Sequence, residues 1–168
     1  VCSSDLGTDD ISNAEKCPIG TFNDKFNQMT EEACVKCPPG TYQDQEGSTS
    51  CVLCESGFYC PIPDGSTDGL TVKTNCPAGY YTDQTGSDNV EDCILCDSGH
   101  YCPLDWTSEA NSCTQGGMCE CPAGTYNNRI GQQLSTQCKA CTGGSICSTT
   151  ALSKPDGACA PGSFCPVG

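Results

Sequence analysis

Cysteine is the residue whose spacing in this chain could do chemistry. Four Cys-x-x-Cys pairs recur, and each follows a Cys-Pro-x-Gly motif; the pairs begin at Cys34, Cys51, Cys93 and Cys138. Two thiols at this spacing can bind zinc, act in a redox enzyme or join structural disulfides. The first two pairs approach zinc-ribbon spacing, but the chain adds Cys-x5-Cys pairs and has a single histidine. A thioredoxin-type centre needs a strand and then a helix around the motif, and no such pattern is present. We therefore expect structural disulfides, with no metal site and no cofactor.

Acid–base catalysis has little support in the sequence. His100 is the only histidine, and it occupies an aromatic position beside Tyr101, before a closing cysteine. We interpret it as a packed structural residue. Carboxylates are concentrated in the polar stretch 83–92, but nothing there matches an EF-hand. We predict no catalytic residue and no enzymatic activity.

A repeated motif must position the cysteines. In Cys-Pro-x-Gly, proline fixes φ after the cysteine and glycine permits a turn with positive φ. The dipeptide after glycine starts a strand and ends in an aromatic residue: Thr21-Phe22, Thr41-Tyr42, Tyr80-Tyr81 and Thr125-Tyr126. A second aromatic set precedes closing cysteines: Phe58-Tyr59, His100-Tyr101 and Phe164. We expect both sets to pack against disulfides inside the repeats.

The repeats divide the chain into an acidic lead-in, residues 1–16, and four cysteine-rich modules. The modules span residues 17–36, 37–75, 76–120 and 121–168. Cys37 ends one motif and begins the next, so neighbouring modules should stack without a linker. Residues 70–72 alternate and predict a short strand. The expected fold is small and disulfide-rich: an elongated tandem array of modules with short antiparallel strands, little helix and no shared core.

Composition sets the compartment and excludes several partners. Nineteen cysteines in 168 residues are typical of a disulfide scaffold in an oxidising environment, so we expect an extracellular or cell-surface protein. A net charge of −14, with only 7 basic residues, argues against nucleic-acid binding. No stretch is apolar and long enough to span a membrane. The only N-linked acceptor is the weak Asn111-Ser112-Cys113, so any glycans should be O-linked or proline-linked.

The stretches CPPGTYQDQEGSTSCVLC and CPAGYYTDQTGSDNVEDCILC resemble the ephrin-receptor-like cysteine-rich repeat. That repeat is similar in layout to tumour necrosis factor receptor and EGF-like modules, and it occurs in large extracellular protist proteins such as surface antigens and mastigoneme proteins. The resemblance implies a tandem array and no particular activity.

The resemblance also implies a disulfide pattern. It pairs Cys17–Cys34, Cys37–Cys51, Cys76–Cys93 and Cys121–Cys138. In the last two modules it crosses the remaining cysteines as Cys96–Cys113, Cys102–Cys119, Cys141–Cys159 and Cys147–Cys165. The second module lacks two of these cysteines, which leaves Cys54 to pair with Cys60. The sequence alone permits other connectivities.

Two functions fit these features. The first is an extracellular structural protein, a disulfide-linked rod that serves as a filament, coat or stalk subunit. The second is a receptor or surface-antigen ectodomain, which would display exposed aromatic residues to a protein partner; Trp106 is the one aromatic left for that role. An odd number of cysteines leaves at least one without an internal partner, and we expect Cys2 to be free for an intermolecular bond. Together with the final Cys165-Pro166-Val167-Gly168, which has the form of a module start, this predicts self-association head to tail.

Overall fold

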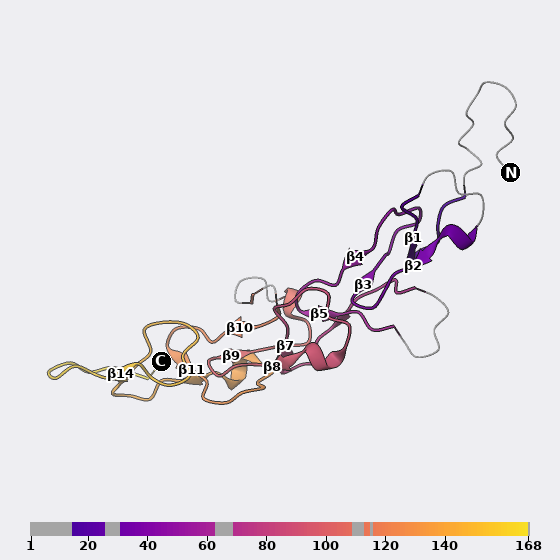
Figure 1. Ribbon diagram of the computed structural model, residues 1–168. Coiled ribbons are helices and arrows are strands. Elements are labelled where there is room, and N and C mark those ends of the chain that lie inside the picture. Colours follow the sequence, from indigo (N-terminus) through magenta and orange to yellow (C-terminus); the bar gives the residue numbers. More distant parts are fainter. Residues whose placement is uncertain (1–14, 26–30, 63–68, 109–112, 115, 168) are drawn as a thin grey trace, which may run out of the picture.

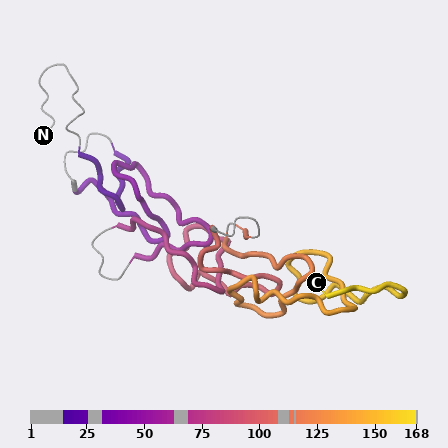
Figure 2. Tube along the Cα trace, turned by 180° about the vertical axis from the view of Figure 1, so that it is seen from behind, coloured from indigo at the N-terminus to yellow at the C-terminus, as the bar shows by residue number. Residues whose placement is uncertain are grey.

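The computed structural model describes residues 15–25, 31–62, 69–108, 113–114 and 116–167, which form a bent rod (Figure 1). The chain follows the rod from one end to the other in sequence order, as the colour gradient in Figure 2 shows. The expected elongated tandem arrangement is therefore confirmed. No helix in this part of the chain is long and apolar enough to cross a membrane.

Seven separate two-stranded antiparallel sheets make up the described fold. Each is a hairpin whose first strand follows a glycine and whose second strand precedes a cysteine. In chain order the hairpins are hairpin 1, β1 (Thr21–Phe22) with β2 (Val35–Lys36); hairpin 2, β3 (Thr41–Tyr42) with β4 (Val52–Leu53); hairpin 3, β5 (Phe58–Tyr59) with β6 (Thr74–Asn75); hairpin 4, β7 (Tyr80–Tyr81) with β8 (Ile94–Leu95); hairpin 5, β9 (His100–Tyr101) with β10 (Cys119–Glu120); hairpin 6, β11 (Thr125–Tyr126) with β12 (Lys139–Ala140); and hairpin 7, β13 (Ser145–Ile146) with β14 (Gly157–Ala158).

Helix is confined to single turns in the described residues. The loops contain four short 3-10 segments: η2 (Glu31–Ala33), η3 (Val90–Asp92), η4 (Trp106–Ser108) and η5 (Ser135–Gln137). In η3 the Asn89 side chain accepts from the Glu91 amide, and the Asp92 carboxylate accepts from the Asn89 amide. This reciprocal capping box explains why a turn of helix forms in a polar loop.

The strand expected at residues 70–72 is wrong. The second strand of hairpin 3 is Thr74–Asn75, directly before Cys76. Every hairpin places its second strand in this position, because the following cysteine fixes the register. Local alternation over three residues is a weaker constraint than that covalent and hydrogen-bonded end point.

The hairpin, rather than the longer module, is thus the repeating structural unit. Hairpin 1 fills the expected module 17–36, while hairpins 2 and 3, 4 and 5, and 6 and 7 fall in modules 37–75, 76–120 and 121–168. Successive hairpins are joined alike within a module and between modules, as the hydrogen bonds below show. The grouping of hairpins into modules therefore stays a prediction.

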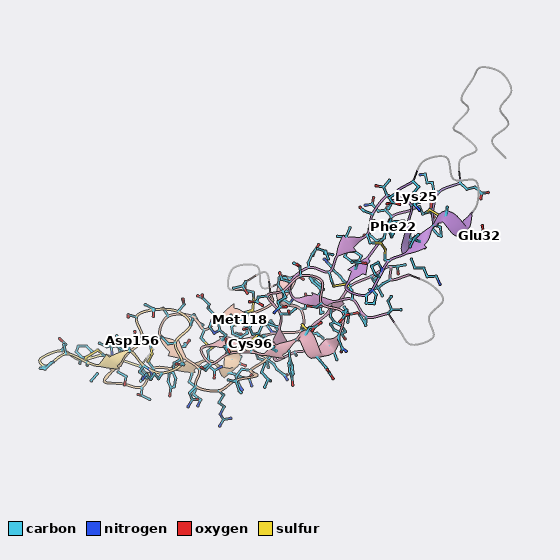
Figure 3. All side chains as sticks on the ribbon, in the orientation of Figure 1. Phe22, Lys25, Glu32, Cys96, Met118 and Asp156 are labelled. Carbon is cyan, nitrogen blue, oxygen red and sulfur yellow. A yellow bond between two sulfur atoms is a disulfide. The ribbon has the colours of Figure 1, made fainter. Side chains whose placement is uncertain are left out.

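Nine disulfides join the described cysteines in two classes (Figure 3). The long class closes a whole hairpin: Cys17–Cys34, Cys37–Cys51, Cys76–Cys93 and Cys121–Cys138. The short class joins cysteines six residues apart: Cys54–Cys60, Cys96–Cys102, Cys113–Cys119, Cys141–Cys147 and Cys159–Cys165. The long pairs and Cys54–Cys60 are those expected from the sequence. Cys2 lies outside the described residues.

The expected crossed pairs are wrong. The structure contains none of Cys96–Cys113, Cys102–Cys119, Cys141–Cys159 and Cys147–Cys165; it joins each of these cysteines to its neighbour six residues away. The reason is the Cys-x-x-Gly turn, which reverses the chain and returns the third residue after glycine to the opening cysteine. Cys113 and Cys119 face each other across an antiparallel bridge instead. Local geometry therefore decides the connectivity.

Sulfur forms most of the buried core. Among the described hydrophobic residues the buried ones are Tyr81, Tyr101 and eleven cysteines. Tyr81 packs with Cys96 and Cys102 and is covered by Met118, and Tyr101 packs with Cys119 and Cys121. These contacts confirm the interior role expected for the two tyrosines. The same expectation is wrong for Phe164, whose side chain is 90% exposed.

Proteolysis of the oxidised protein distinguishes the two connectivities. Cleavage before Asp105 separates Cys96–Cys102 from Cys113–Cys119, and cleavage before Asp156 separates Cys141–Cys147 from Cys159–Cys165. We expect the fragments on either side of both sites to separate without reductant after digestion with an Asp-specific endoprotease in urea. Crossed disulfides would hold those fragments together, and mass spectrometry of the unreduced digest would then show the linked products.

Candidate functional site: the cysteine–glycine junctions

Each junction between hairpins begins with the same tight turn. The residue after glycine donates its N–H to the carbonyl of the residue after cysteine, as Tyr80 does to Pro77 at 2.9 Å. Glycine is then the third residue of a type II turn, the position that needs positive φ. All eight such glycines have φ between 77° and 87°: Gly20, Gly40, Gly57, Gly79, Gly99, Gly124, Gly144 and Gly162.

The backbone of this turn holds the next hairpin. The Gly79 carbonyl accepts from the Cys96 amide at 2.9 Å, and the Gly79 amide donates to the Cys102 carbonyl at 2.7 Å. The same two bonds recur, at 2.7–3.1 Å, at the glycines of all seven hairpins. Two peptide groups that a turn would leave exposed are therefore paired at every junction.

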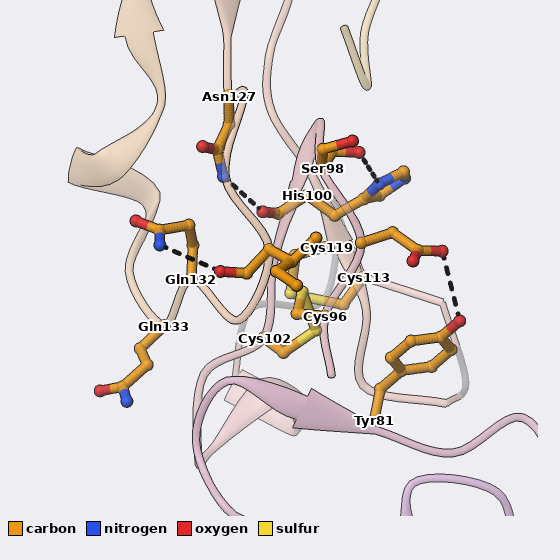
Figure 4. Close-up of a disulfide and its surroundings, with 12 residues drawn as sticks. Tyr81, Cys96, Ser98, His100, Cys102, Cys113, Cys119, Asn127, Gln132 and Gln133 are labelled. Carbon is orange, nitrogen blue, oxygen red and sulfur yellow. Dashed lines mark hydrogen bonds between the residues drawn. A yellow bond between two sulfur atoms is a disulfide. The ribbon is translucent and has the colours of Figure 1, made fainter. Parts of the chain in front are cut away.

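The residue three positions after glycine forms the centre of each junction. In hairpins 3, 5 and 7 this residue is the second cysteine of a short disulfide, for example Cys102. In hairpins 2, 4 and 6 it is Gln43, Thr82 or Asn127, each buried. The Asn127 side chain donates to the His100 carbonyl at 2.9 Å and accepts from the Arg129 amide at 3.1 Å (Figure 4). The buried side-chain amide of Asn127 thus has both its donor and its acceptor hydrogen-bonded, and it occupies the position that a disulfide cysteine occupies in the neighbouring hairpins.

Sequence reasoning missed these three polar residues. It assigned roles to the cysteines, the glycines and the aromatic residues of the repeat and none to these positions. Their spacing from the turn glycine was nevertheless visible, because Cys60, Cys102 and Cys147 stand at the same distance from theirs. Aligning the hairpins on glycine, instead of aligning the modules on cysteine, would have found them.

Loops also reach back to the hairpin two places earlier. Gly131 in hairpin 6 donates its amide to the Cys96 carbonyl, and its own carbonyl lies against Gly79 of hairpin 4. Gly86 lies against Gly40, and Ala151 against Gly99, in the same way. The hairpins therefore form two interleaved series: an odd series (1, 3, 5 and 7) and an even series (2, 4 and 6).

A glycine-to-alanine pair separates the cost of the turn from the cost of stacking. Gly79→Ala would place a Cβ 2.7 Å from the Gly131 carbonyl oxygen, whereas a Cβ at Gly144 meets nothing within 4 Å, and both glycines have φ of 85–87°. We expect Gly144→Ala to cost about 1–2 kcal/mol for the left-handed backbone. Gly79→Ala should add about 1–3 kcal/mol from overpacking.

Hydrogen exchange measures this difference. The Cys96 and Cys159 amides, which donate to the two glycine carbonyls, report local opening of the altered junctions. Because the disulfides hold the chain together, local exchange is more informative than a global transition. Equal acceleration of exchange in the two variants would contradict the role given to stacking.

Tyr81 links the even and odd series electrostatically. Its hydroxyl donates to the Asp97 carboxylate at 3.4 Å (Figure 4). Burial, and then the negative charges of Asp97 and Asp83, raise the pKa of the Tyr81 phenol above its usual value. The protonated phenol is the form that fits this site, since a phenolate would be poorly solvated and would face a carboxylate.

This pKa shift predicts a stability change at alkaline pH. The unfolded phenol titrates near pH 10, so the contribution of Tyr81 is fully present below that pH and is lost as pH rises through the higher folded pKa. We expect the tyrosinate absorbance at 295 nm to contain a component above pH 10 that is absent from Tyr81→Phe. An unchanged titration curve in that variant would show that Tyr81 is not shielded.

A groove of about 440 Å³ lies between hairpins 2 and 3 and is lined by Tyr42, Asp44, Phe58, Lys73 and their neighbours. Lys73 already occupies the aromatic surface there. Its ammonium lies 4.2 Å from the centre of the Phe58 ring and 5.9 Å from that of Tyr42, and it forms an ion pair with Glu55. The contact with Phe58 lies within hairpin 3, and the longer approach to Tyr42 reaches hairpin 2.

Trp106 is not the exposed aromatic that a receptor surface would use. It is partly buried, its ring centre is 5.8 Å from that of Phe58, and it packs against Gly117 and the Tyr101 cluster. It therefore joins hairpins 3 and 5 of the odd series.

The structure places His100 in β9 as a structural residue. Its ring is partly buried, and Nδ1 lies 3.2 Å from the Ser98 carbonyl oxygen (Figure 4). The Asp83, Asp88, Glu91 and Asp92 carboxylates stay exposed in the hairpin 4 loop. Among the described residues no three His, Cys, Asp or Glu side chains form a group that could hold a metal.

Comparison with known proteins finds similar sequences. Residues 25–68 match the tyrosine-protein kinase ephrin type A/B receptor-like family. That segment is therefore similar to the ephrin-receptor-like family, and the chain is a cysteine-rich repeat protein. The matched residues include the junction between hairpins 2 and 3, in which Gly40 is hydrogen-bonded to Cys54 and Cys60.

Three relatives are each similar to part of this chain. A sushi, von Willebrand factor type A, EGF and pentraxin domain-containing protein 1 from Mus musculus is 34% identical over 86 residues, 42% of this chain. Thyroglobulin from Mus musculus is 36% identical over 74 residues, also 42% of this chain. Cysteine repeat modular protein A from Toxoplasma gondii is 36% identical over 74 residues, 44% of this chain. Each match spans only 2% of the relative's length.

Proposed function

We propose that this chain is an extracellular structural rod, a filament, coat or stalk subunit without enzymatic activity. The observation that carries the proposal is the unbroken series of identical junctions. The same pair of backbone hydrogen bonds joins every hairpin to the next, from Gly20 to Cys165. A chain that repeats one kind of junction along its described length is suited to act as a stiff spacer.

Covalent closure supports the same role. Each hairpin carries at least one disulfide, and closing a loop of about 15 residues is worth about 3 kcal/mol in the chain-entropy model. Such cross-links persist where the environment is oxidising, which supports an extracellular or surface location. The excess of acidic residues keeps exposed rods soluble.

The packing of Trp106 favours the rod over the receptor ectodomain. An ectodomain that binds a protein partner needs large aromatic or arginine anchors on its surface. Trp106, Tyr81, Tyr101 and Phe58 instead contact disulfides or neighbouring hairpins. The described aromatic residues that are largely exposed are Tyr80 and Phe164.

Head-to-tail self-association is part of the proposal. The turn at Cys159–Cys165 has the geometry of the seven earlier turns, with φ of 82° at Gly162. Within the described residues, however, Gly162 makes neither of the two junction bonds, and no atom lies within 4 Å of a Cβ placed there. In the proposed assembly, a hairpin from a second copy makes these two bonds with the turn. Cys2 as an intermolecular cross-link, and O-linked or proline-linked glycans on exposed residues, remain proposals.

Electron microscopy of the native material tests the rod and its assembly. We expect thin filaments longer than one chain, and we expect Gly162→Arg to leave single rods because the side chain blocks the open turn. Gly157→Arg is the matched control, since Gly157 is also exposed with no atom within 4 Å of its Cβ but lies in β14. Isolated monomers in the unaltered protein, or filaments that persist in Gly162→Arg, would refute head-to-tail assembly. Compact particles would refute the rod.

A further inference from the structure

Exposed apolar side chains are concentrated on the even series of hairpins. Of the fourteen large hydrophobic residues that are exposed in the described chain, hairpins 2, 4 and 6 carry eight, and the four hairpins of the odd series carry four. The eight are Val52, Leu53, Tyr80, Val90, Ile94, Leu95, Ile130 and Leu134. The disulfide core explains none of these positions, because their side chains face solvent.

Four of these residues lie at or directly beside the contact between hairpins 4 and 6. Tyr80 and Leu95 stand directly opposite each other in the β7–β8 register, so their side chains share a face. A Cδ atom of Leu95 lies 3.0 Å from the position of a Cβ on Gly131, next to Ile130. Leu134 follows Gln133, whose Cγ packs on Gly79. These four side chains are 39–59% exposed; we call them the 4–6 patch.

The two hairpins that carry the 4–6 patch have opposite charges. Residues 76–96 contain four Asp or Glu residues and no Lys or Arg, a net charge of −4. Residues 121–141 contain Arg129 and Lys139 and no carboxylate, a net charge of +2. The acidic side chains and both basic ones are exposed. The 4–6 patch therefore spans one acidic hairpin and one basic hairpin.

We propose that the 4–6 patch binds a second copy of this chain, side by side and antiparallel about a two-fold axis. Hairpin 4 of each copy then faces hairpin 6 of the other. The apolar side chains of the two patches meet, and each acidic loop meets the basic residues of its partner.

Self-complementarity is what identifies the partner as a second copy. In a two-fold interface residue i contacts j while j contacts i, so a patch that spans hairpins of opposite charge satisfies both contacts at once. Repulsion between the remaining acidic residues is screened beyond about 8 Å at physiological ionic strength. The pairing closes at two copies and uses the sides of the rods, so it does not rest on the proposed head-to-tail filament.

Complementary charge reversal tests the pairing by sedimentation velocity. One variant, Asp88→Lys with Glu91→Lys, makes the acidic hairpin neutral; the other, Arg129→Glu with Lys139→Glu, makes the basic hairpin acidic. We expect each variant alone to dimerise at least about tenfold more weakly than the unaltered chain. Mixing the two should restore dimers, because hairpin 6 of the first variant, still basic, then faces hairpin 4 of the second, still acidic, and the repulsion within dimers of the second variant is absent.

Matched controls separate the patch from general charge and folding effects. Lys36→Glu with Lys154→Glu makes the same change in net charge on hairpins of the odd series, and it should dimerise at most slightly more weakly. Ile130→Asn should weaken dimerisation about tenfold, whereas Val72→Asn, at a residue that is 64% exposed on the odd series, should not. Disulfide mapping of every variant confirms that each has folded.

Three outcomes would overturn the proposal. The first is an unaltered chain that stays monomeric over a concentration series up to about 1 mM at physiological salt, well above a micromolar dissociation constant. The second is a dimer that the patch variants do not weaken. The third is a mixture of the two charge-reversed variants that remains monomeric. Species that grow beyond dimers and disappear in Gly162→Arg would instead report head-to-tail contacts, so the two associations are distinguishable.

Discussion

The hydrogen bonds made by one glycine peptide group determine how this protein is built. At every hairpin the turn glycine donates its amide to the next hairpin and accepts from the amide of the following cysteine. Both bonds require the positive φ that glycine supplies. A hairpin of two-residue strands could not be stable alone, since it has neither a ladder nor a core of useful size. The hydrogen bonds of the turn glycine join each hairpin to the next one, and the disulfides hold the loop of each hairpin closed.

Disulfides and buried amides act as alternatives at the centre of the junctions. Cys102 and Asn127 occupy equivalent places in successive hairpins, one bonded covalently to the opening cysteine and the other hydrogen-bonded to backbone. The backbone carbonyl of Cys102 or Asn127 accepts from the turn glycine of the preceding hairpin. Its backbone amide donates to the loop of the next hairpin. The backbone arrangement is therefore the conserved part of the repeat within this chain, and side chains fill it in more than one way.

The sequence predicted the fold class well and the connectivity only in part. Cysteine spacing and the Cys-Pro-x-Gly turns were enough for the elongated array and the short strands, because both are local in the chain. The long disulfides followed from the resemblance to the ephrin-receptor-like repeat. The prediction of crossed pairs was wrong because the cysteine spacing permits a disulfide either to the cysteine six residues away or to a more distant one. Only the conformation of the turn decides between these two disulfides. The roles of Gln43, Thr82 and Asn127, and the contacts between hairpins two apart, depend on stacking. No local sequence pattern shows directly which hairpins will contact each other.

The interleaving of two series of hairpins imposes a parity on the chain. Each of these loops contacts the hairpin two places before its own, so hairpins of one series always differ in number by a multiple of two. Duplicating or deleting two consecutive hairpins would leave every downstream loop on its original series. Gaining or losing a single hairpin would transfer the whole downstream surface to the other series and rotate its apolar and charged residues away from their former side. Growth of such a rod by recombination should therefore proceed in pairs of hairpins.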